Sequence, residues 1–284
     1  MGGGSYSISN RTERAFASGY FHKSANEIFS DSLHKEMQSV GVEIRESCDS
    51  EEHPESKAII IALDVTGSMG IVPHELIKNG LPNIMKTLLE KGVKDPQIMF
   101  MAIGDHKCDR APLQLGQFES SDELMDKWLE KIWLEGGGGG NGGESYHLAW
   151  YFAANHTSID CFNNRHEKGL LITIGDDKTH RQIKGEALKE VMGNGEFEKE
   201  LSAVKLLDDA RNKYDVFHIN FLDWRGSQEE TKNDWKELIG DHLFNASDVL
   251  GIIDLIGQIC MDKYVSKIKK QTTTPKNNET EIIL

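Results

Sequence analysis

The stretch that decides the fold is IIIALDVTGSMG, residues 59–70. It begins as an uninterrupted apolar run and ends in a short turn that contains Asp64, Thr66 and Ser68. A continuous apolar run is typical of a strand that is covered on both faces, as in a parallel sheet. Ligands of open parallel sheets bind beyond the carboxyl ends of the strands, so these three side chains are predicted to lie at a binding edge. Ligands that are all oxygen atoms suit Mg2+ or Mn2+ and not Zn2+.

Strand and helix patterns alternate on the C-terminal side of this stretch. Further buried strands are predicted at residues 96–104, 169–175 and 215–222. Residues 111–118 follow the second strand so closely that we predict an antiparallel edge strand there. Alternating βα units wind into a mostly parallel sheet with right-handed crossovers. The predicted fold is therefore α/β: a doubly wound, mostly parallel six-stranded sheet with one antiparallel edge strand and helices on both faces.

Helices are predicted between these strands from apolar residues at helical spacing. One runs from Leu76 to Leu89, and Gly80 and Pro82 are expected to bend it. The other predicted helices are 122–133, 144–155, one marked by Phe197, Leu201, Val204 and Leu207, one around 235–239, and a long one after Ser247.

The predicted domain spans residues 57–268, with flanking segments on both sides. Residues 1–23 are rich in Gly and Ser and are predicted to be an arm that becomes ordered only by docking. A helix is predicted over 24–40, and the acidic residues 46–56 are predicted to form a linker. The arm, the helix and the linker together make up the predicted N-terminal region, residues 1–56. Residues 269–284 are polar and are predicted to form a flexible C-terminal tail.

Charge and hydropathy exclude two classes of partner. A net charge of −14 repels phosphate backbones and anionic lipids, so neither nucleic acid nor a membrane surface is an expected partner. The longest apolar run, residues 58–63, is too short to cross a bilayer, and no signal-peptide pattern is found near the start. We expect a cytoplasmic protein.

The turn DVTGSM, with the strand before it, resembles the metal-ion-dependent adhesion site (MIDAS) of von Willebrand factor A (vWA) domains. The resemblance extends as an order of elements over residues 57–268. LLITIGDDKTH, residues 170–180, is similar to the strand end ITDxxxH of an intracellular, partly bacterial branch that is associated with alpha-kinases. FMAIGDHKCD, residues 100–109, resembles the YRDxxD stretch of that branch.

The resemblance implies a metal site and a ligand set. Thr66 and Ser68 would bind Mg2+ (or Mn2+) directly, and Asp64 and Asp176 would act mainly through waters and hydrogen bonds. An acidic group of a partner protein would complete the coordination shell, which is recognition and not catalysis.

One expected ligand of the family is missing. The family usually has a Thr in a GGT setting in the loop before its third helix, but this loop reads GGGGGNGGES, residues 136–145. Asn141 can supply a carbonyl oxygen, Glu144 or Ser145 can fold inward, or the cation can be held by fewer protein ligands. The glycines themselves fit either a flexible loop or close backbone access to the metal, and no phosphate-binding motif is present.

Several polar residues near the strand ends have two interpretations. Asp105, His106, Asp109 and His180 are either at the rim of the metal site or ordinary loop residues in solvent. His218 lies inside a predicted strand and is interpreted as a core histidine with satisfied hydrogen bonds.

Two functions from different classes fit the sequence. The first is a metal-dependent protein–protein interaction module, an adaptor or scaffold without enzymatic activity. The resemblance implies that the protein acts as an adaptor together with an AAA+ ATPase or a kinase system. The alternative is a Mg2+-dependent phosphatase-like hydrolase, since such enzymes use a DxDxT strand end. Thr66 stands in the place of the second Asp of that motif, and a threonine cannot deliver a proton near neutral pH.

Overall fold

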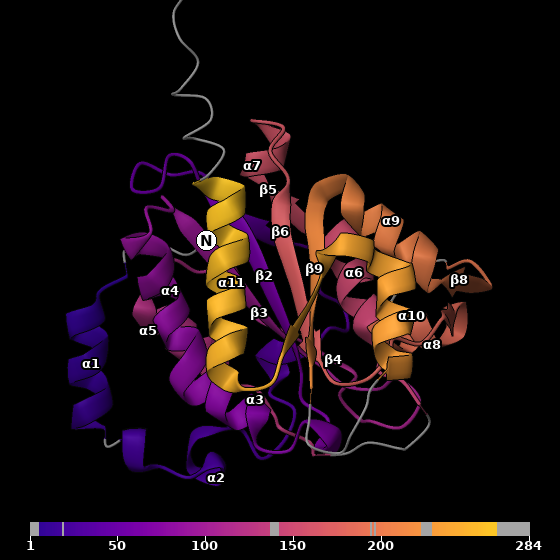
Figure 1. Ribbon diagram of the computed structural model, residues 1–284, viewed down its shortest axis with the longest axis horizontal. Helices are drawn as coiled ribbons and strands as arrows, with labels where there is room; N and C mark the ends of the chain where they lie inside the picture. The colour runs from indigo at the N-terminus through magenta and orange to yellow at the C-terminus, as the bar shows by residue number, and fades with distance from the viewer. Residues whose placement is uncertain are drawn as a thin grey trace, which may run out of the picture.

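A six-stranded sheet forms the centre of the molecule, with strand order β10-β9-β6-β2-β3-β4 (Figure 1). The computed structural model describes residues 6–18, 20–136, 142–193, 195, 197–222 and 229–265. The strands of the sheet are β2 (Lys57–Asp64), β3 (Pro96–Ile103), β4 (Leu113–Leu115), β6 (Gly169–Gly175), β9 (Tyr214–Phe221) and β10 (Leu243–Ala246).

Every neighbouring pair in this sheet is parallel except β3 and β4, which are antiparallel. The prediction of a mostly parallel six-stranded sheet with one antiparallel edge is therefore confirmed. Five of the strands lie where the sequence predicts them. The sixth, β10, is only four residues long and was not located from the sequence, because so short an edge strand carries no periodic signal.

Strand β2 lies between β3 and β6, with both faces covered. Its side chains alternate between two cores: Ile59 and Ile61 pack in one, and Ala58 and Ile60 in the other. All are completely buried, which explains why the sequence of this strand is apolar without interruption.

Helices cover both faces of the sheet, as predicted (Figure 1). On one face lie α3 (Val72–Glu75), α4 (Leu81–Glu90), α5 (Asp122–Glu130) and α11 (Val249–Tyr264). On the other lie α6 (Tyr146–Asn155), α8 (Gly185–Met192), α9 (Ala203–Lys213) and α10 (Glu229–Ile239). None of the helices in the described residues is long and apolar enough to cross a bilayer.

The helical segment predicted from Leu76 to Leu89 changes its hydrogen-bond pattern at Gly80 and Pro82, where a bend was predicted. Between α3 and α4 the helix widens into a π-turn, Leu76–Gly80, and Pro82 follows in the first turn of α4. Proline has no N–H to donate, so the regular hydrogen-bond ladder cannot continue through this point.

The remaining elements lie outside these two groups of helices and the central sheet. They are α1 (Ile8–Ala17), α2 (Ala25–Ile28), α7 (Asp160–Asn163), β1 (Arg45–Ser47), β5 (Thr157–Ile159), β7 (Gln182–Lys184), β8 (Glu200–Ser202) and 3-10 turns at Tyr20–His22, Lys35–Met37, Gly67–Met69 and Gly240–His242. Strand β1 pairs with β5, and β7 with β8.

The helix predicted over residues 24–40 is wrong. Only the single α-helical turn α2 and the 3-10 turn Lys35–Met37 form there. At Ser30 the chain leaves the helical path, because its N–H bonds to the carbonyl of Ile132 and its hydroxyl to the carbonyl of Ser32. Such local side-chain bonds compete with helix formation. Ile28 and Met37 are nevertheless buried, so the apolar spacing marked core residues and not a helix.

Two other predictions need correction. The stretch 46–56 begins inside β1, which pairs with β5, and Ser56 is bound to the carboxylate of Asp49. The second correction concerns the helix marked by Phe197 and Leu201. This helix begins only at Ala203, because residues 200–202 form β8. The C-terminal tail 269–284 lies outside the described residues.

Candidate metal-binding site

Four of the predicted ligand residues come together at the carboxyl ends of β2 and β6. The hydroxyl of Thr66 donates to Oδ1 of Asp64 at 2.7 Å and lies 3.2 Å from the hydroxyl of Ser68. Ser68 in turn donates to Oδ1 of Asp176 at 2.7 Å. The neighbouring positions of β2 and β6 in the sheet therefore place Asp176 beside residues more than a hundred positions earlier in the chain.

The local backbone folds this way because the side chain of Asp64 accepts hydrogen bonds from the turn that directly follows it. Its Oδ1 accepts the N–H of Thr66 at 2.9 Å, an Asx-turn that stops the strand. The next residues form the 3-10 turn Gly67–Met69, which turns the side chain of Ser68 back toward Thr66. Gly70 then ends the turn with a φ of 54°, a conformation that favours glycine.

The carboxyl group of Asp64 is fully buried. Its Oδ2 accepts a 2.6 Å hydrogen bond from the hydroxyl of Tyr146, which lies in the first turn of α6. Burial raises the pKa of Asp64 to about 7, although hydrogen bonds from Tyr146 and Thr66 oppose the shift. The nearby charge of Asp176 raises the pKa further.

The last residue of β6, Gly175, makes room for this arrangement. A Cβ at Gly175 would lie 1.8 Å from the hydroxyl oxygen of Tyr146. Glycine is therefore required at this position if Tyr146 is to reach Asp64.

Glu144 folds inward, which was one of the three alternatives that the sequence left open. It is 7% exposed, its N–H bonds to the carbonyl of Lys178, and its Oε2 is buried without a hydrogen-bond partner among the described residues. Burial raises the pKa of Glu144 to about 9, and the negative charges of Asp64 and Asp105 raise it further. A buried carboxylate oxygen without a partner, beside Asp64, is chemically suited to a hard cation.

The other two candidates of this loop do not add to the cluster. Ser145 is buried, but its hydroxyl accepts the N–H of His106 at 2.9 Å and faces that residue. Asn141 lies outside the described residues.

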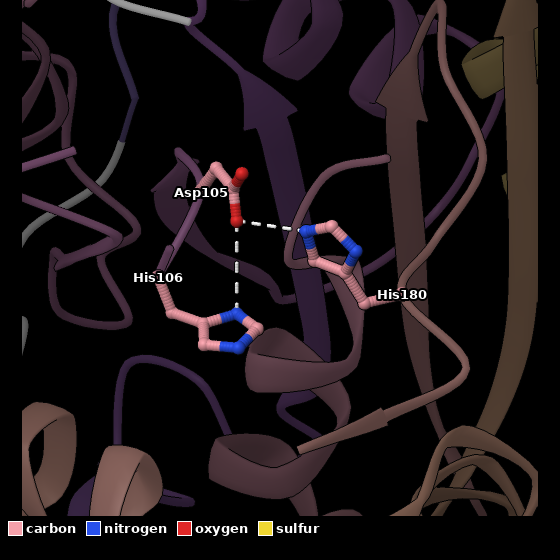
Figure 2. Close-up of side chains that lie close together, drawn as sticks. All are labelled: Asp105, His106 and His180. Carbon is pink, nitrogen blue, oxygen red and sulfur yellow. Dashed lines mark hydrogen bonds and ion pairs between the residues drawn. The ribbon is translucent and has the colours of Figure 1, made fainter. Parts of the chain in front are cut away.

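A second polar cluster lies at the ends of β3 and β6 (Figure 2). Oδ1 of Asp105 is 2.8 Å from Nε2 of His180 and 3.7 Å from Nδ1 of His106. Asp105 is fully buried and His180 is 6% exposed, so neither is an ordinary loop residue in solvent. Asp109 is turned back on the loop, where its Oδ2 accepts the N–H of Asp105 at 2.7 Å.

Two further histidines, His147 and His218, are fully buried in the core. His147, on α6, was not identified from the sequence, because a single histidine on a buried helix face carries no motif. Its ring contacts those of His106 and His180 edge to face. His218 is a core histidine as predicted: it is buried, stacks on Trp235, and its Nδ1 lies 2.9 Å from the hydroxyl of Thr173. Its Nε2, however, has no partner among the described residues.

Comparison with known proteins finds only distant structural similarity. No protein-family model matches the sequence, and no curated protein is significantly similar to it. Among solved structures, the pilus adhesin SpaC from Lactobacillus rhamnosus GG in its open conformation gives a TM-score of 0.49 at 10% identity, covering 76% of this chain and 31% of that one.

Two of the similar structures are described as von Willebrand factor domains. The vWF domain of the pilus tip protein Mfa5 from Porphyromonas gingivalis gives a TM-score of 0.45 at 12% identity, covering 78% of this chain and 97% of that one. A von Willebrand factor type A protein from Catenulispora acidiphila gives 0.41 at 12% identity, covering 80% and 48%. This chain thus spans less than half of the SpaC and Catenulispora chains. Similarity at this level does not identify the family or the function of the chain.

Proposed function

We propose that this chain is a divalent-cation-dependent protein-binding module of the vWA type, without enzymatic activity of its own. The observation that carries the proposal is the hydrogen-bonded series Tyr146–Asp64–Thr66–Ser68–Asp176, which gathers oxygen atoms from two neighbouring strand ends. Such a series, at the carboxyl edge of a parallel sheet, is where an open α/β fold binds its ligand.

The residues present fit a hard cation. Thr66, Ser68 and Asp176 offer oxygen atoms, and Asp64 lies behind them, where Tyr146 and Thr66 hold its carboxylate. We propose that these residues hold Mg2+ or Mn2+, and that Glu144 takes the place of the threonine that the family usually has in this loop. Bound there, the cation would supply positive charge and coordination positions for an oxygen ligand of a partner protein.

The buried Oε2 of Glu144 supports this assignment. A buried carboxylate without a hydrogen-bond partner is costly, and a cation removes that cost. Burial and neighbouring acids raise the pKa of both Asp64 and Glu144, and a cation bound beside them would act in the opposite direction.

The geometry of Asp64 disfavours the phosphatase-like alternative. A nucleophilic aspartate needs an accessible oxygen, but both oxygens of Asp64 accept hydrogen bonds and the residue is 0% exposed. Thr66 directs its hydroxyl proton to Asp64 and not outward.

The partner class follows from the same chemistry. We propose that a carboxylate of a protein partner, as a side chain or a chain end, is the incoming ligand, and that the module acts as an intracellular adaptor, for example with an AAA+ ATPase or a kinase system. A carboxylate is the ligand that Mg2+ takes most readily from a protein.

The experiment has a metal arm and a ligand arm. Titration calorimetry of Mg2+ and Mn2+ into EDTA-treated protein should show one site, which Ser68→Ala weakens and Ser32→Ala, an exposed control, does not. A peptide library that pairs each Asp or Glu with Asn or Gln should then yield binders that need both the carboxylate and the cation.

Several results would overturn the proposal. One is cation binding that Ser68→Ala leaves unchanged, and another is peptide capture that is indifferent to EDTA. Cation-dependent hydrolysis of p-nitrophenyl phosphate that is lost in Asp64→Asn would establish the alternative instead.

A further inference from the structure

We propose that Asp105, His106 and His180 form a second metal site, which takes Zn2+ and clips together the loops that follow β3 and β6. The proposal does not depend on the Mg2+ site, because none of these residues supplies an oxygen atom to the Thr66–Ser68–Asp176 cluster. It is carried by the geometry of the three side chains and by the chemistry of their donor atoms.

The donor atoms already converge. One ligand atom from each of Asp105, His106 and His180 lies within 4.8 Å of the other two. Figure 2 shows both imidazole rings directed at the same carboxylate. Two of the residues follow β3 and the third follows β6, so a shared cation would connect segments that are 75 residues apart in the sequence.

The surroundings hold the carboxylate in place. Oδ1 of Asp105 accepts the N–H of Lys107 at 3.0 Å, and its Oδ2 receives the thiol of Cys108 at 3.4 Å. The carbonyl of Gly104 accepts the N–H of Ser145, which ties this loop to the start of α6. Ligands that are oriented by surrounding hydrogen bonds are characteristic of metal centres.

A second, independent observation points to a ligand here. Nε2 of His147 is buried without a hydrogen-bond partner among the described residues, and the residue is 0% exposed. Its ring lies against those of both His106 and His180, with centroids 5.4 Å and 6.3 Å away. Its Nδ1 lies 3.3 Å from the hydroxyl of Thr179, which leaves Nε2 as the nitrogen to be satisfied. His147 is therefore a buried imidazole beside the cluster with one nitrogen that accepts or donates no hydrogen bond among the described residues.

The donor set selects the metal. Two imidazole nitrogens and one carboxylate oxygen suit Zn2+, whereas Mg2+ requires oxygen ligands in an octahedral shell. The two clusters therefore have different preferences: oxygen at Ser68 and Asp176, nitrogen at His106 and His180.

Zn2+ would replace a proton that is now shared. Nζ of Lys107 lies 3.0 Å from Nδ1 of His180, so that nitrogen accepts, and Nε2 donates its proton to Asp105. When Zn2+ binds at Nε2, this proton moves to Nδ1, so the ring stays neutral, and the Asp105 oxygen becomes a ligand. Lys107 is exposed and can leave Nδ1, which then carries the proton.

Zn2+ bound at this site would also hold part of the neighbouring Mg2+ site in place. The N–H of His180 donates to the carbonyl oxygen of Glu144 at 3.1 Å, and Glu144 is the residue that we propose for the Mg2+ site. A Cβ on Gly143 would lie 3.1 Å from Nδ1 of His180, so Gly143 also packs closely against this cluster. Fixing His180 therefore fixes the loop that carries Glu144.

The test uses tag-free, full-length protein freed of metal with EDTA. Titration calorimetry with Zn2+, and the visible absorption of bound Co2+, should both report one site with nitrogen ligands. His106→Gln and His180→Gln should each lower Zn2+ affinity at least about tenfold. His166→Asn, which changes an exposed histidine elsewhere on the surface, should leave the affinity unchanged.

The matched controls separate the two sites and exclude a folding artefact. Mg2+ titration of His106→Gln should still show binding, while Asp176→Asn should lose Mg2+ and keep Zn2+. The proposal is overturned if the wild-type protein binds no Zn2+ or if both His→Gln variants bind it normally. It is also overturned if Zn2+ binding is lost in Asp176→Asn and retained in His106→Gln, since the ion would then occupy the oxygen site.

Discussion

The hydroxyl of Ser68 donates a 2.7 Å hydrogen bond to Oδ1 of Asp176, and this contact joins two segments that are 108 residues apart in the sequence. It exists because β2 and β6 are neighbours in the sheet, so their carboxyl ends meet at one edge. The candidate Mg2+ site depends on this contact more than on any other.

We predict that Ser68→Ala lowers Mg2+ affinity much more than it lowers stability. Ser68 is half-buried, so removing its hydroxyl should cost only about 1 kcal/mol of unfolding free energy. The same change removes a proposed ligand of the cation. Calorimetric Mg2+ titration and urea unfolding of the same sample measure the two effects. Equal Mg2+ affinity in the wild type and the variant would contradict the assignment of Ser68.

We predict that without a divalent cation the protein loses stability as the pH rises from about 4 to about 7. The folded state raises the pKa of Asp64 to about 7, compared with ~3.9 for an unfolded chain. Between these values the folded state holds a proton that the unfolded state has released, so stability falls with increasing pH. Glu144, whose pKa is raised to about 9, extends the loss to higher pH.

Thermal melts in EDTA and in Mg2+ measure this effect. The cation stabilises the ionised carboxylates, so Mg2+ should raise the Tm more at pH 8 than at pH 5. Asp64→Asn, which cannot titrate, should show a smaller decrease between pH 4 and pH 7 than the wild type. An identical pH profile in the variant would show that Asp64 does not contribute.

We predict that Tyr146→Phe destabilises the fold by about 1–3 kcal/mol, because it removes the donor to a buried carboxyl oxygen. The phenyl ring keeps its packing against Trp235, so the lost hydrogen bond dominates the effect. Chemical denaturation of the two proteins gives the difference. A variant as stable as the wild type would show that Asp64 Oδ2 finds another donor.

We predict that Gly175→Ala displaces Tyr146 from Asp64. The new Cβ would lie 1.8 Å from the tyrosine oxygen, which is far too close for a non-bonded contact, so the ring has to move. Overpacking of a filled core costs about 1–3 kcal/mol. The double variant Gly175→Ala with Tyr146→Phe should be less destabilised than the sum of the two single changes, and unfolding measurements on all three proteins test this. Simple additivity would mean that the two positions do not share this contact.

We predict that the double variant Arg11→Ala with Arg14→Ala loosens α1 from α5 without unfolding the sheet. Arg11 lies 2.9 Å from Asp126, and Arg14 pairs with Asp122 and Asp126. These pairs are partly exposed, so the loss of stability should be only about 1 kcal/mol. Hydrogen exchange should become faster in α1 while β2 and β6 stay protected. Unchanged exchange in α1 would show that apolar contacts alone hold it.

The architecture could be predicted because local patterns and the tertiary structure agree along most of the chain. The apolar run of β2 indicates a strand covered on both faces, and the short connection to β4 indicates an antiparallel edge. Agreement fails where elements are very short. Strands β7, β8 and β10 contain three or four residues, and a period cannot be read from so few.

The N-terminal region shows a different kind of failure. The spacing of Ile28 and Met37 is compatible with a helix, and both side chains are buried, but the backbone at Ser30 bonds to residues near Trp133 instead. Apolar spacing reports which side chains are inside and leaves the path of the chain between them undetermined.

The sequence by itself determined the first half of the oxygen site, Asp64, Thr66 and Ser68, and left the role of Asp105 and His106 open. The Asx-turn at Asp64 brings Thr66 and Ser68 together through contacts between residues two positions apart, so local spacing was enough to find them. Only the tertiary structure decided that Glu144 is buried while the hydroxyl of Ser145 binds His106. It also decided that His180 lies beside Asp105 and His106, with the ring of His147 against both imidazoles. The physical reason is that strand order and helix packing bring these residues together from separate parts of the chain, and no local periodicity records which loops become neighbours.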